Sequence, residues 1–353
     1  MGNLLVLPGV TVEQAFTSTV ETMPLTQEIL NRYEKLSKKS SYSCDFDFNI
    51  YNMLEKRFKG EKLSVPLINK DVFSKISGKE NVLLSYNYGC TNDNIYSYEK
   101  MHYSIKGQWN KPFPMPTDVT KVWQIFYTVF ETKKRSKYRK MLEKREPIRL
   151  GGYIDSFMWM DRKYKVTREI VKILNHYNYP YIIETRSDLV GKDGYVDIIS
   201  KDLAKIVMCF VNTNDAIVKV LEPGAPSQKR RLGCIQKLIR KGFNVQAHVN
   251  FFPIYSDGYF SKNNTDFKKS EYFSYDILEN LCLHGAANVS FEMLRVSSYT
   301  VNKISSSLSF CFREFFNTQA AERDYFYSEK EVLEYKKRFE NTLFHKGMKI
   351  CGF

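Results

Sequence analysis

The chain contains few residues of the types that form metal sites and disulfides. Its 353 residues include seven cysteines and five histidines. No two cysteines form a Cys-x2-Cys pair and the histidines show no ligand spacing, which excludes the common zinc-finger motifs. An odd number of scattered cysteines also argues against a disulfide framework. We therefore expect reduced thiols and a cytoplasmic, reducing compartment.

Long apolar runs are also missing. The first eight residues (MGNLLVLP) have no basic region, and their apolar run is too short for a signal peptide or a membrane span. We therefore expect no membrane insertion. The sequence shows no internal repeat either, so a repeat architecture is not expected.

Acidic residues are outnumbered. The chain has 39 Asp and Glu residues against 53 Lys and Arg residues, a formal net charge of +14. An excess of this size favours polyanionic partners such as nucleic acid, or an acidic membrane surface. Charge alone does not choose between these partners.

Apolar and aromatic residues, at 43% and 15%, are sufficient for a large core. Short apolar runs alternate with amphipathic segments from residue 81 onward, which predicts βα units and a parallel sheet. Periodicity alone allows a partial barrel, a full barrel or a doubly wound sheet. Strands are expected at 16–20, 82–86, 147–150, 181–185, 206–211, 245–252 and 289–294. Helices are expected at 25–36, 48–58, 119–144, 161–177, 193–200, 226–241, 273–284 and 328–344.

A loop with one cysteine follows the strand at 82–86. Three residues separate Cys90 from Asn94, and two separate Asn94 from Ser97. With cysteine at all three positions the loop would read Cys-x3-Cys-x2-Cys, a spacing that aims three thiolates at a [4Fe-4S] cluster. Asparagine and serine lack the soft sulfur ligand. We therefore expect no cluster held in the usual way.

Further motifs follow in a fixed order along the chain. They are RLGGYID at 149–155, IETRS at 183–187, LEPGAPSQKRRL at 221–232, FPIY at 252–255 and SFEMLR at 290–295. Together with the loop around Cys90 and residues 16–26, they resemble the spore photoproduct lyase branch of the radical S-adenosylmethionine (AdoMet) superfamily, over most of residues 10 to 305. The element EPGAPS before a helix is the most specific of them.

The resemblance implies an α/β fold with a partial (β/α)6 barrel of the radical AdoMet type. Residues 1–80 would form an N-terminal α/β extension, residues 81–298 the barrel and residues 299–353 a C-terminal helical extension. That branch of the superfamily also has a cysteine that returns a hydrogen atom to product. No residue from Leu150 to Asp155 is a cysteine, so lesion reversal by that route is not expected.

Candidate cofactor residues follow the predicted strands, where parallel α/β folds place their sites. A glycine pair also serves close packing of backbones, an arginine at a strand end also forms surface ion pairs, and the EPGAPS element also shapes a helix start. With these alternatives open, we predict seven cofactor-binding residues: Gly151, Gly152, Asp155, Thr185, Arg186, Asn212 and Glu222.

Residues 133–145 (KKRSKYRKMLEKR), here called the basic segment, carry eight basic residues and one acid. They are predicted at the end of the helix 119–144. Cations interleaved with an aromatic residue are typical of a phosphate-contacting surface, although cations also favour a helix C-terminus. The predicted nucleic-acid contacts are Lys133, Lys134, Arg135, Lys137, Tyr138, Arg139, Lys140, Lys144 and Arg145.

Three hypotheses follow. The first is a pseudoenzyme of the lyase-like branch that has lost the cluster, has AdoMet only as an optional ligand, and binds DNA or RNA through its basic surface. The second is an active lyase or nucleic-acid-modifying enzyme that uses other cluster ligands, such as Cys209 or Cys234, or AdoMet without a cluster. The third is a structural subunit of a larger protein assembly that contacts nucleic acid.

Overall fold

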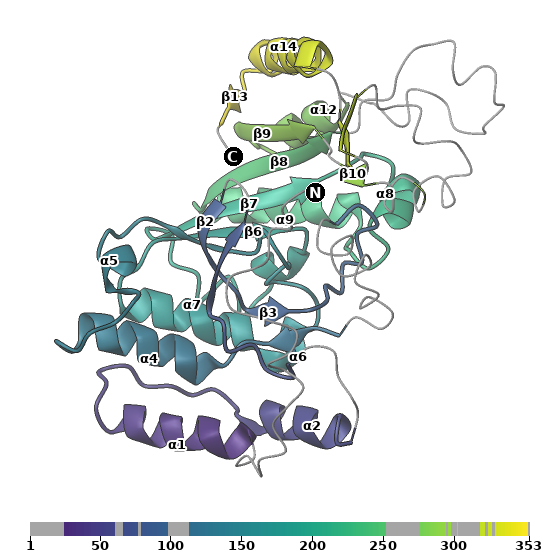
Figure 1. The fold of residues 1–353 in the computed structure, drawn as a ribbon. Coiled ribbons are helices and arrows are strands. Elements are labelled where there is room, and N and C mark those ends of the chain that lie inside the picture. The colour runs from purple at the N-terminus through teal and green to yellow at the C-terminus, as the bar shows by residue number, and fades with distance from the viewer. Residues whose placement is uncertain are drawn as a thin grey trace.

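The computed structural model describes residues 25–60, 66–76, 79–97, 113–251, 276–293, 296–297, 302, 318–321, 324–326 and 329–351. The strand predicted at 16–20 and the motif at 252–255 lie outside these residues. A sheet of eight strands, in the order β1-β2-β5-β6-β7-β8-β9-β13, runs through the molecule (Figure 1). In the described part of the chain, no helix has the length and apolar character needed to cross a membrane.

Six strands of this sheet correspond to those predicted from 82–86 onward, although the first ends at Leu83 rather than Tyr86, and they run parallel to one another. They are β2 (Lys79–Leu83), β5 (Ile148–Leu150), β6 (Tyr181–Thr185), β7 (Ala204–Phe210), β8 (Asn244–Phe251) and β9 (Asn288–Met293). Two unpredicted strands extend the edges. The antiparallel β1 (Phe73–Ile76) pairs with β2, and the short parallel β13 (Lys349–Ile350) pairs with β9.

Smaller strands lie outside this sheet. The loop after β2 is bounded by β3 (Tyr86–Asn87), which pairs with β4 (Met115–Pro116). A three-stranded sheet is formed by β10 (Val296–Ser297), β12 (Asp324–Phe326) and β11 (Thr318–Ala321). The division of the chain at residues 80 and 298 stays a prediction.

Five helices match the predicted segments: α1 (Leu25–Ser37), α2 (Asn49–Arg57), α9 (Gln228–Arg240), α12 (Asp276–Leu283) and α14 (Glu329–His345). The single helix predicted at 119–144 is wrong. Helix α4 (Val119–Phe130) ends where its buried apolar positions end, and only the short α5 (Arg139–Leu142) follows. The cationic residues between the two helices offer no apolar side chains for a helix to bury.

Two other helix predictions also need correction. The segment 161–177 is split into α6 (Asp161–Tyr164) and α7 (Val166–His176), because Lys165 adopts a left-handed conformation with φ of 57°. The segment 193–200 forms turns after a 3-10 helix, η1 (Asp188–Gly191), where Gly194 at φ of 80° interrupts the chain. Helix α8 (Asp215–Leu221) was not predicted.

The hydrophobic core lies between the sheet and its helices. In β8, Val245, Ala247 and Val249 belong to the core, whereas Gln246 and His248 lie on the opposite face, as strand alternation requires. Helices α4 and α7 cover the core side, and α1 and α2 form a further layer beneath them (Figure 1). At β8 the sheet therefore has one apolar, helix-covered face and one face with buried polar side chains, whereas in β7 the second face carries the buried Val207 and Cys209.

Candidate functional site

The loop after β3, residues 88–97, is closely packed against the segment that joins α8 to α9. The backbone amide of Ile95 donates a hydrogen bond to the carbonyl of Leu221 at 2.9 Å. The backbone amide of Gly224 donates to the carbonyl of Asn92 at 3.0 Å. A Cβ atom on Gly224 would lie 1.8 Å from the carbonyl oxygen of Thr91. Glycine is therefore required at position 224 to let the two backbones approach.

The residues of this loop do not fit a [4Fe-4S] cluster held by three thiolates. Cys90 is half-buried, and the other two positions supply an amide, Asn94, and a hydroxyl, Ser97. Both are hard oxygen donors, whereas iron-sulfur clusters are held by cysteine sulfur. Among the residues that the structure describes, no group of three or more His, Cys, Asp or Glu side chains is arranged to hold a metal ion.

A buried carboxylate, Glu222, lies at the centre of an ion-pair network beside the loop. It accepts hydrogen bonds from the Tyr96 hydroxyl, from Nε of Arg186 at 2.9 Å and from the Arg231 guanidinium. Arg231 also donates to the carbonyls of Pro226 at 2.9 Å and Cys209 at 3.1 Å. Both Glu222 and Arg231 are completely buried, so each charge has its partners inside the protein.

Electrostatics keeps Glu222 ionised. Burial by itself raises the pKa of this carboxyl, but the positive charges of Arg231 and Arg186 outweigh burial and hold the pKa below its ordinary value. Burial, together with the neighbouring Glu222, raises the pKa of Tyr96 despite the opposing charge of Arg186, so its phenol stays protonated and donates. The network is therefore a stable arrangement of two cations, one anion and one neutral donor.

Asp155 forms a second buried centre. Its carboxylate accepts from the Asn92 amide group at 2.6 Å, the Thr185 hydroxyl at 2.7 Å, the backbone amide of Arg186 at 2.8 Å and that of Phe157 at 2.9 Å. Burial raises the pKa of Asp155 more than these hydrogen bonds lower it. The carboxylate ties the loop after β3 to the ends of β5 and β6.

Four of the seven predicted cofactor residues are thus joined by hydrogen bonds: Asp155, Thr185, Arg186 and Glu222. Gly151 follows β5 at φ of 100°, and a Cβ there would lie 2.0 Å from the carbonyl oxygen of Glu184. This contact favours the close-packing interpretation of Gly151, while Gly152 at φ of 82° continues the same turn. Asn212 is buried, and its side chain accepts from the amide of Asn214 at 2.8 Å. A ligand role for the seven residues stays a prediction.

Sequence reasoning missed three members of these networks: Asn92, Tyr96 and Arg231. For Arg231 a signal was present, because Arg231, Cys234, Ile235 and Leu238 share the spacing of one helix face and all are buried. Of the two alternative cluster ligands, Cys209 is buried on β7 and Cys234 packs in the core against η1. Burial raises the pKa of the Cys234 thiol to about 12, which disfavours the thiolate.

One arginine of the basic segment, Arg139, stabilises the fold. The Arg139 guanidinium donates to the carbonyls of Thr128, Val129, Thr132 and Lys134 at 2.7 to 3.0 Å, and so satisfies the C-terminal end of α4. These contacts, together with an ion pair to the exposed Glu143, leave little of the guanidinium for another partner.

Two further members of the basic segment are also engaged within the protein. The Arg145 guanidinium lies over the Phe130 ring at 4.3 Å and donates to the Tyr177 carbonyl at 2.7 Å. The Tyr138 ring is half-buried against Phe73. The ninth member of the predicted set, Lys144, is exposed and lies 3.8 Å from Glu146.

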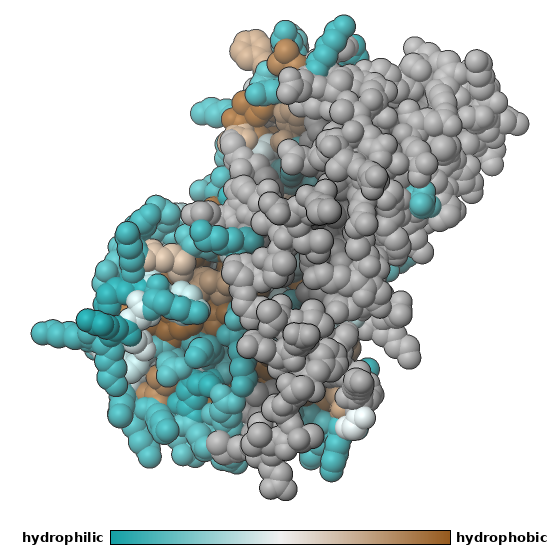
Figure 2. All heavy atoms as spheres, in the orientation of Figure 1, coloured by the Kyte–Doolittle hydropathy of each residue, from teal (hydrophilic) through white to brown (hydrophobic). Residues whose placement is uncertain are grey.

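The other cations of the basic segment are exposed, and none pairs with an acidic side chain among the described residues. These exposed cations are Lys133, Lys134, Arg135, Lys137 and Lys140. They precede β5 and therefore lie at the amino edge of the parallel strands, opposite the carboxyl edge that carries the two buried networks. In Figure 2, hydrophilic side chains project from the side of the molecule where α4 ends.

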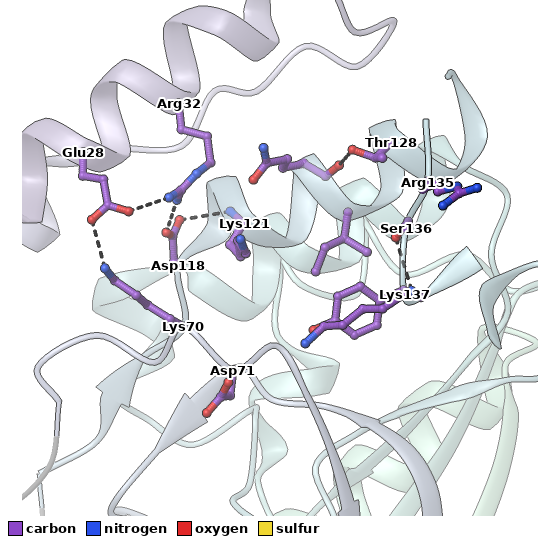
Figure 3. A pocket seen from close by; sticks show the side chains of 13 residues that line it. Glu28, Arg32, Lys70, Asp71, Asp118, Lys121, Thr128, Arg135, Ser136 and Lys137 are labelled. Carbon is purple, nitrogen blue, oxygen red and sulfur yellow. Dashed lines mark hydrogen bonds and ion pairs between the residues drawn. The ribbon is translucent and has the colours of Figure 1, made fainter. Parts of the chain in front are cut away.

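A cavity of about 510 Å³ lies between α1, α4 and the basic segment (Figure 3). At one end, Glu28 is paired with Arg32 at 2.8 Å and with Lys70 at 2.9 Å, and Asp118 is also paired with Arg32. Asp71 is the remaining acid of the lining and is exposed. The other charged lining residues are Lys121, Arg135 and Lys137. The cavity thus has more cations than acids and opens beside the exposed lysines.

Comparison with known proteins gives a match in structure only. No protein-family model matches the chain, and no curated protein matches it significantly. Spore photoproduct lyase complexed with dinucleoside spore photoproduct is similar, with a TM-score of 0.59 and 14% sequence identity, over 85% of this chain and 94% of that chain. A double mutant of the same enzyme with bound AdoMet and dinucleoside spore photoproduct has a TM-score of 0.61 and 13% identity, over 86% and 94%. The likeness confirms the predicted α/β fold with a partial barrel of the radical AdoMet type.

Proposed function

We propose that this protein binds nucleic acid through its basic segment and does not use a [4Fe-4S] cluster. The observation that carries the proposal is the set of five exposed cations in the basic segment, Lys133, Lys134, Arg135, Lys137 and Lys140, whose side chains have neither an acidic partner nor a carbonyl partner among the described residues. An exposed cation without a partner is free to contact a phosphate, and each such contact releases counterions from the nucleic acid. The adjoining cavity adds Lys121 to this surface.

Two further observations support the proposal. The spore photoproduct lyase structures of similar fold contain a dinucleoside, which is a fragment of nucleic acid. In this chain, two arginines at the carboxyl edge are already engaged within the protein, since Arg186 and Arg231 both bind Glu222. The loop that corresponds to a cluster motif supplies one thiol, Cys90. Nucleic-acid binding without cluster chemistry is therefore consistent with the exposed cations at the amino edge of the sheet and with the paired charges at its carboxyl edge.

The test is the salt dependence of binding to short labelled DNA and RNA, measured by fluorescence anisotropy. For duplex DNA, we expect log K to fall with log salt concentration with a slope of about −4.5, since each neutralised phosphate contributes about −0.9 and these five cations each contact one phosphate. Replacing Lys133, Lys134 and Arg135 together by alanine should reduce this slope by about 2 to 3.

A matched control removes three cations elsewhere. Lys336, Lys337 and Arg338 are exposed on α14, which lies far from α4 and α5 in Figure 1. Replacing these three by alanine changes the net charge equally, and we expect it to leave most of the salt slope in place. If both triple variants change the slope equally, or if neither changes it, the assignment to the basic segment is wrong.

A further inference from the structure

Trp159 is a large aromatic side chain that the fold leaves in solvent. It is 59% exposed, whereas Trp123 is fully buried and donates to Ser40 at 2.9 Å. It follows β5, in the segment that leads into α6, at the carboxyl edge of the sheet. An exposed indole presents a flat apolar face that water solvates poorly.

Two cationic residues follow Trp159 within one helical turn. The backbone amide of Arg162 donates to the carbonyl of Trp159 at 3.1 Å, and the backbone amide of Lys163 donates to the carbonyl of Met160 at 3.0 Å. These bonds join residues three apart, so the chain is already helical at Trp159. Residues spaced i, i+3 and i+4 lie on one side of a helical turn. Trp159, Arg162 and Lys163 have this spacing, and all three are exposed.

The acid in this segment is turned away from solvent. Asp161 is fully buried and accepts from the Tyr195 hydroxyl at 2.7 Å, the amide of Thr167 at 2.8 Å and the Tyr86 hydroxyl. Lys165, the next exposed residue, adds another cation and has the left-handed conformation that separates α6 from α7. Non-glycine residues in this conformation are uncommon and often mark functional segments.

The cations beside Trp159 have no acidic partner among the described residues. This holds for Arg162, Lys163 and Lys165, and the partly exposed Arg168 has a buried Nε without a hydrogen-bond partner. The surface thus combines one exposed aromatic residue with positive charge that has no acidic partner among the described residues, although the Lys163 ammonium lies 5.9 Å from the centre of the Tyr164 ring. We call Trp159, Arg162, Lys163 and Lys165 the Trp159 surface.

The Trp159 surface and the basic segment lie at opposite ends of α7. Lys165 directly precedes α7, while Arg145 of the basic segment donates to the carbonyl of Tyr177, which caps its other end. A helix of 11 residues is about 16 Å long. The two surfaces are thus separate sites on one molecule.

We infer that the Trp159 surface binds single-stranded nucleic acid: an unpaired base stacks on the indole of Trp159 and the adjacent phosphates contact Arg162 and Lys163. A base inside a duplex already stacks on its neighbours and does not offer its face, whereas a single-stranded base does. The inference rests on the proposed function, because both require a nucleic-acid ligand, but it concerns a different surface and names the strand state.

The experiment compares a labelled oligo-deoxythymidine with a DNA duplex of equal length, using anisotropy at one salt concentration. Trp159→Ala should weaken single-strand binding about tenfold, as expected for the loss of one stacked base, and leave duplex binding unchanged. Trp159→Phe keeps an aromatic ring and should recover most of the loss. Phe344→Ala removes another exposed aromatic residue, 80% exposed on α14, and should change neither affinity.

A second variant tests the phosphate contacts. Arg162→Ala with Lys163→Ala should reduce the salt slope of single-strand binding by about 1.4, since a single strand contributes about −0.7 for each phosphate. Thermal unfolding of each variant checks that the fold is retained.

The outcomes separate the two proposals. If the wild-type protein binds neither strand, both the proposed function and this inference fail. If it binds nucleic acid and the triple variant of Lys133, Lys134 and Arg135 weakens binding, but Trp159→Ala has no effect or weakens both strand types equally, the proposed function stands and this inference is overturned. Selective loss of single-strand binding in Trp159→Ala, restored in Trp159→Phe, supports it.

Discussion

The two edges of the sheet use the same kinds of charged residue in opposite ways. At the carboxyl edge, Arg186 and Arg231 surround Glu222, and none of these charges is directed to solvent as an unpaired group. At the amino edge, Lys133 and Lys137 are exposed without an acidic partner in the described chain. A buried charge must be compensated inside the protein, whereas an exposed charge is compensated by water and ions.

The comparison also shows that position in a cluster of cations does not define a residue's role. Arg139 and Lys140 are neighbours in the basic segment. The Arg139 guanidinium closes the end of α4, whereas Lys140 is exposed. The same contrast occurs in α9, where Arg230 binds Asp188 at the surface and Arg231 is buried. Binding surfaces therefore have to be sought among the cations that the fold does not use.

The largest effect is expected from breaking the buried network. Glu222→Gln keeps the size of the side chain but leaves the buried Arg231 without a counter-charge, which should cost about 3 to 5 kcal/mol in the free energy of unfolding. Glu143→Gln removes the exposed partner of Arg139 and should cost less than about 1 kcal/mol. Urea denaturation measures both, and equal costs would contradict the distinction between the two edges.

Gly151 allows a second test at the carboxyl edge. Gly151→Ala adds a Cβ that would meet the Glu184 carbonyl oxygen at 2.0 Å, and we expect a loss of about 3 kcal/mol. Gly194 also has a positive φ, but no atom lies within 4 Å of its added Cβ, so Gly194→Ala should cost about 1 to 2 kcal/mol. A smaller cost at Gly151 than at Gly194 would refute the close-packing interpretation.

Within the basic segment, we expect Arg139 to contribute to stability and its neighbour Lys140 to contribute to nucleic-acid binding. Arg139→Ala leaves several carbonyls at the end of α4 without a donor and should lower the free energy of unfolding by about 1 to 3 kcal/mol. Lys140→Ala should change stability by less than about 0.5 kcal/mol while reducing the salt slope of duplex binding by about 0.9. A stability loss in Lys140→Ala, or none in Arg139→Ala, would show that the roles are assigned wrongly.

The smallest effect concerns pH. The pKa of Glu222 is lowered in the folded protein, so its contribution to stability is present above about pH 4.3, the ordinary glutamate value, and is lost as the pH falls through the folded pKa. The pKa of Asp155 is raised, so this carboxyl costs stability above its folded pKa, and acidification removes that cost. The two groups therefore give opposite pH slopes.

Urea denaturation across the acidic range measures these slopes. In Glu222→Gln the loss of stability on acidification should be shallower than in the wild-type protein. In Asp155→Asn it should be steeper, because the opposing contribution of Asp155 has been removed. Slopes that change in the same direction in both variants would contradict the assignment of the two carboxyls.

The repeating apolar pattern of the chain was sufficient to predict the parallel strands from β2 to β9, but not the edge strands β1 and β13. Strands β6 and β7 lie where continuous apolar runs were read, because a parallel strand covered on both faces needs such a run. The end of α4 was not predicted, since helix propensity continues into the lysines, whereas its buried face stops at Val129. The break at Lys165 was missed because lysine carries no signal for a left-handed conformation.

In the candidate site, too, some features could be predicted from the sequence and others could not. The residues that follow β5, β6 and β7 could be listed from the sequence, because parallel strands bring their carboxyl ends to one edge. Which side chains bind one another there depended on contacts between segments far apart in the chain: Tyr96 with Glu222, and Asn92 with Asp155. Local patterns determine elements because periodicity is a short-range property. Only the packed structure decides which charges are paired inside the protein and which, as at Lys133 and Arg162, remain exposed without an acidic partner among the described residues.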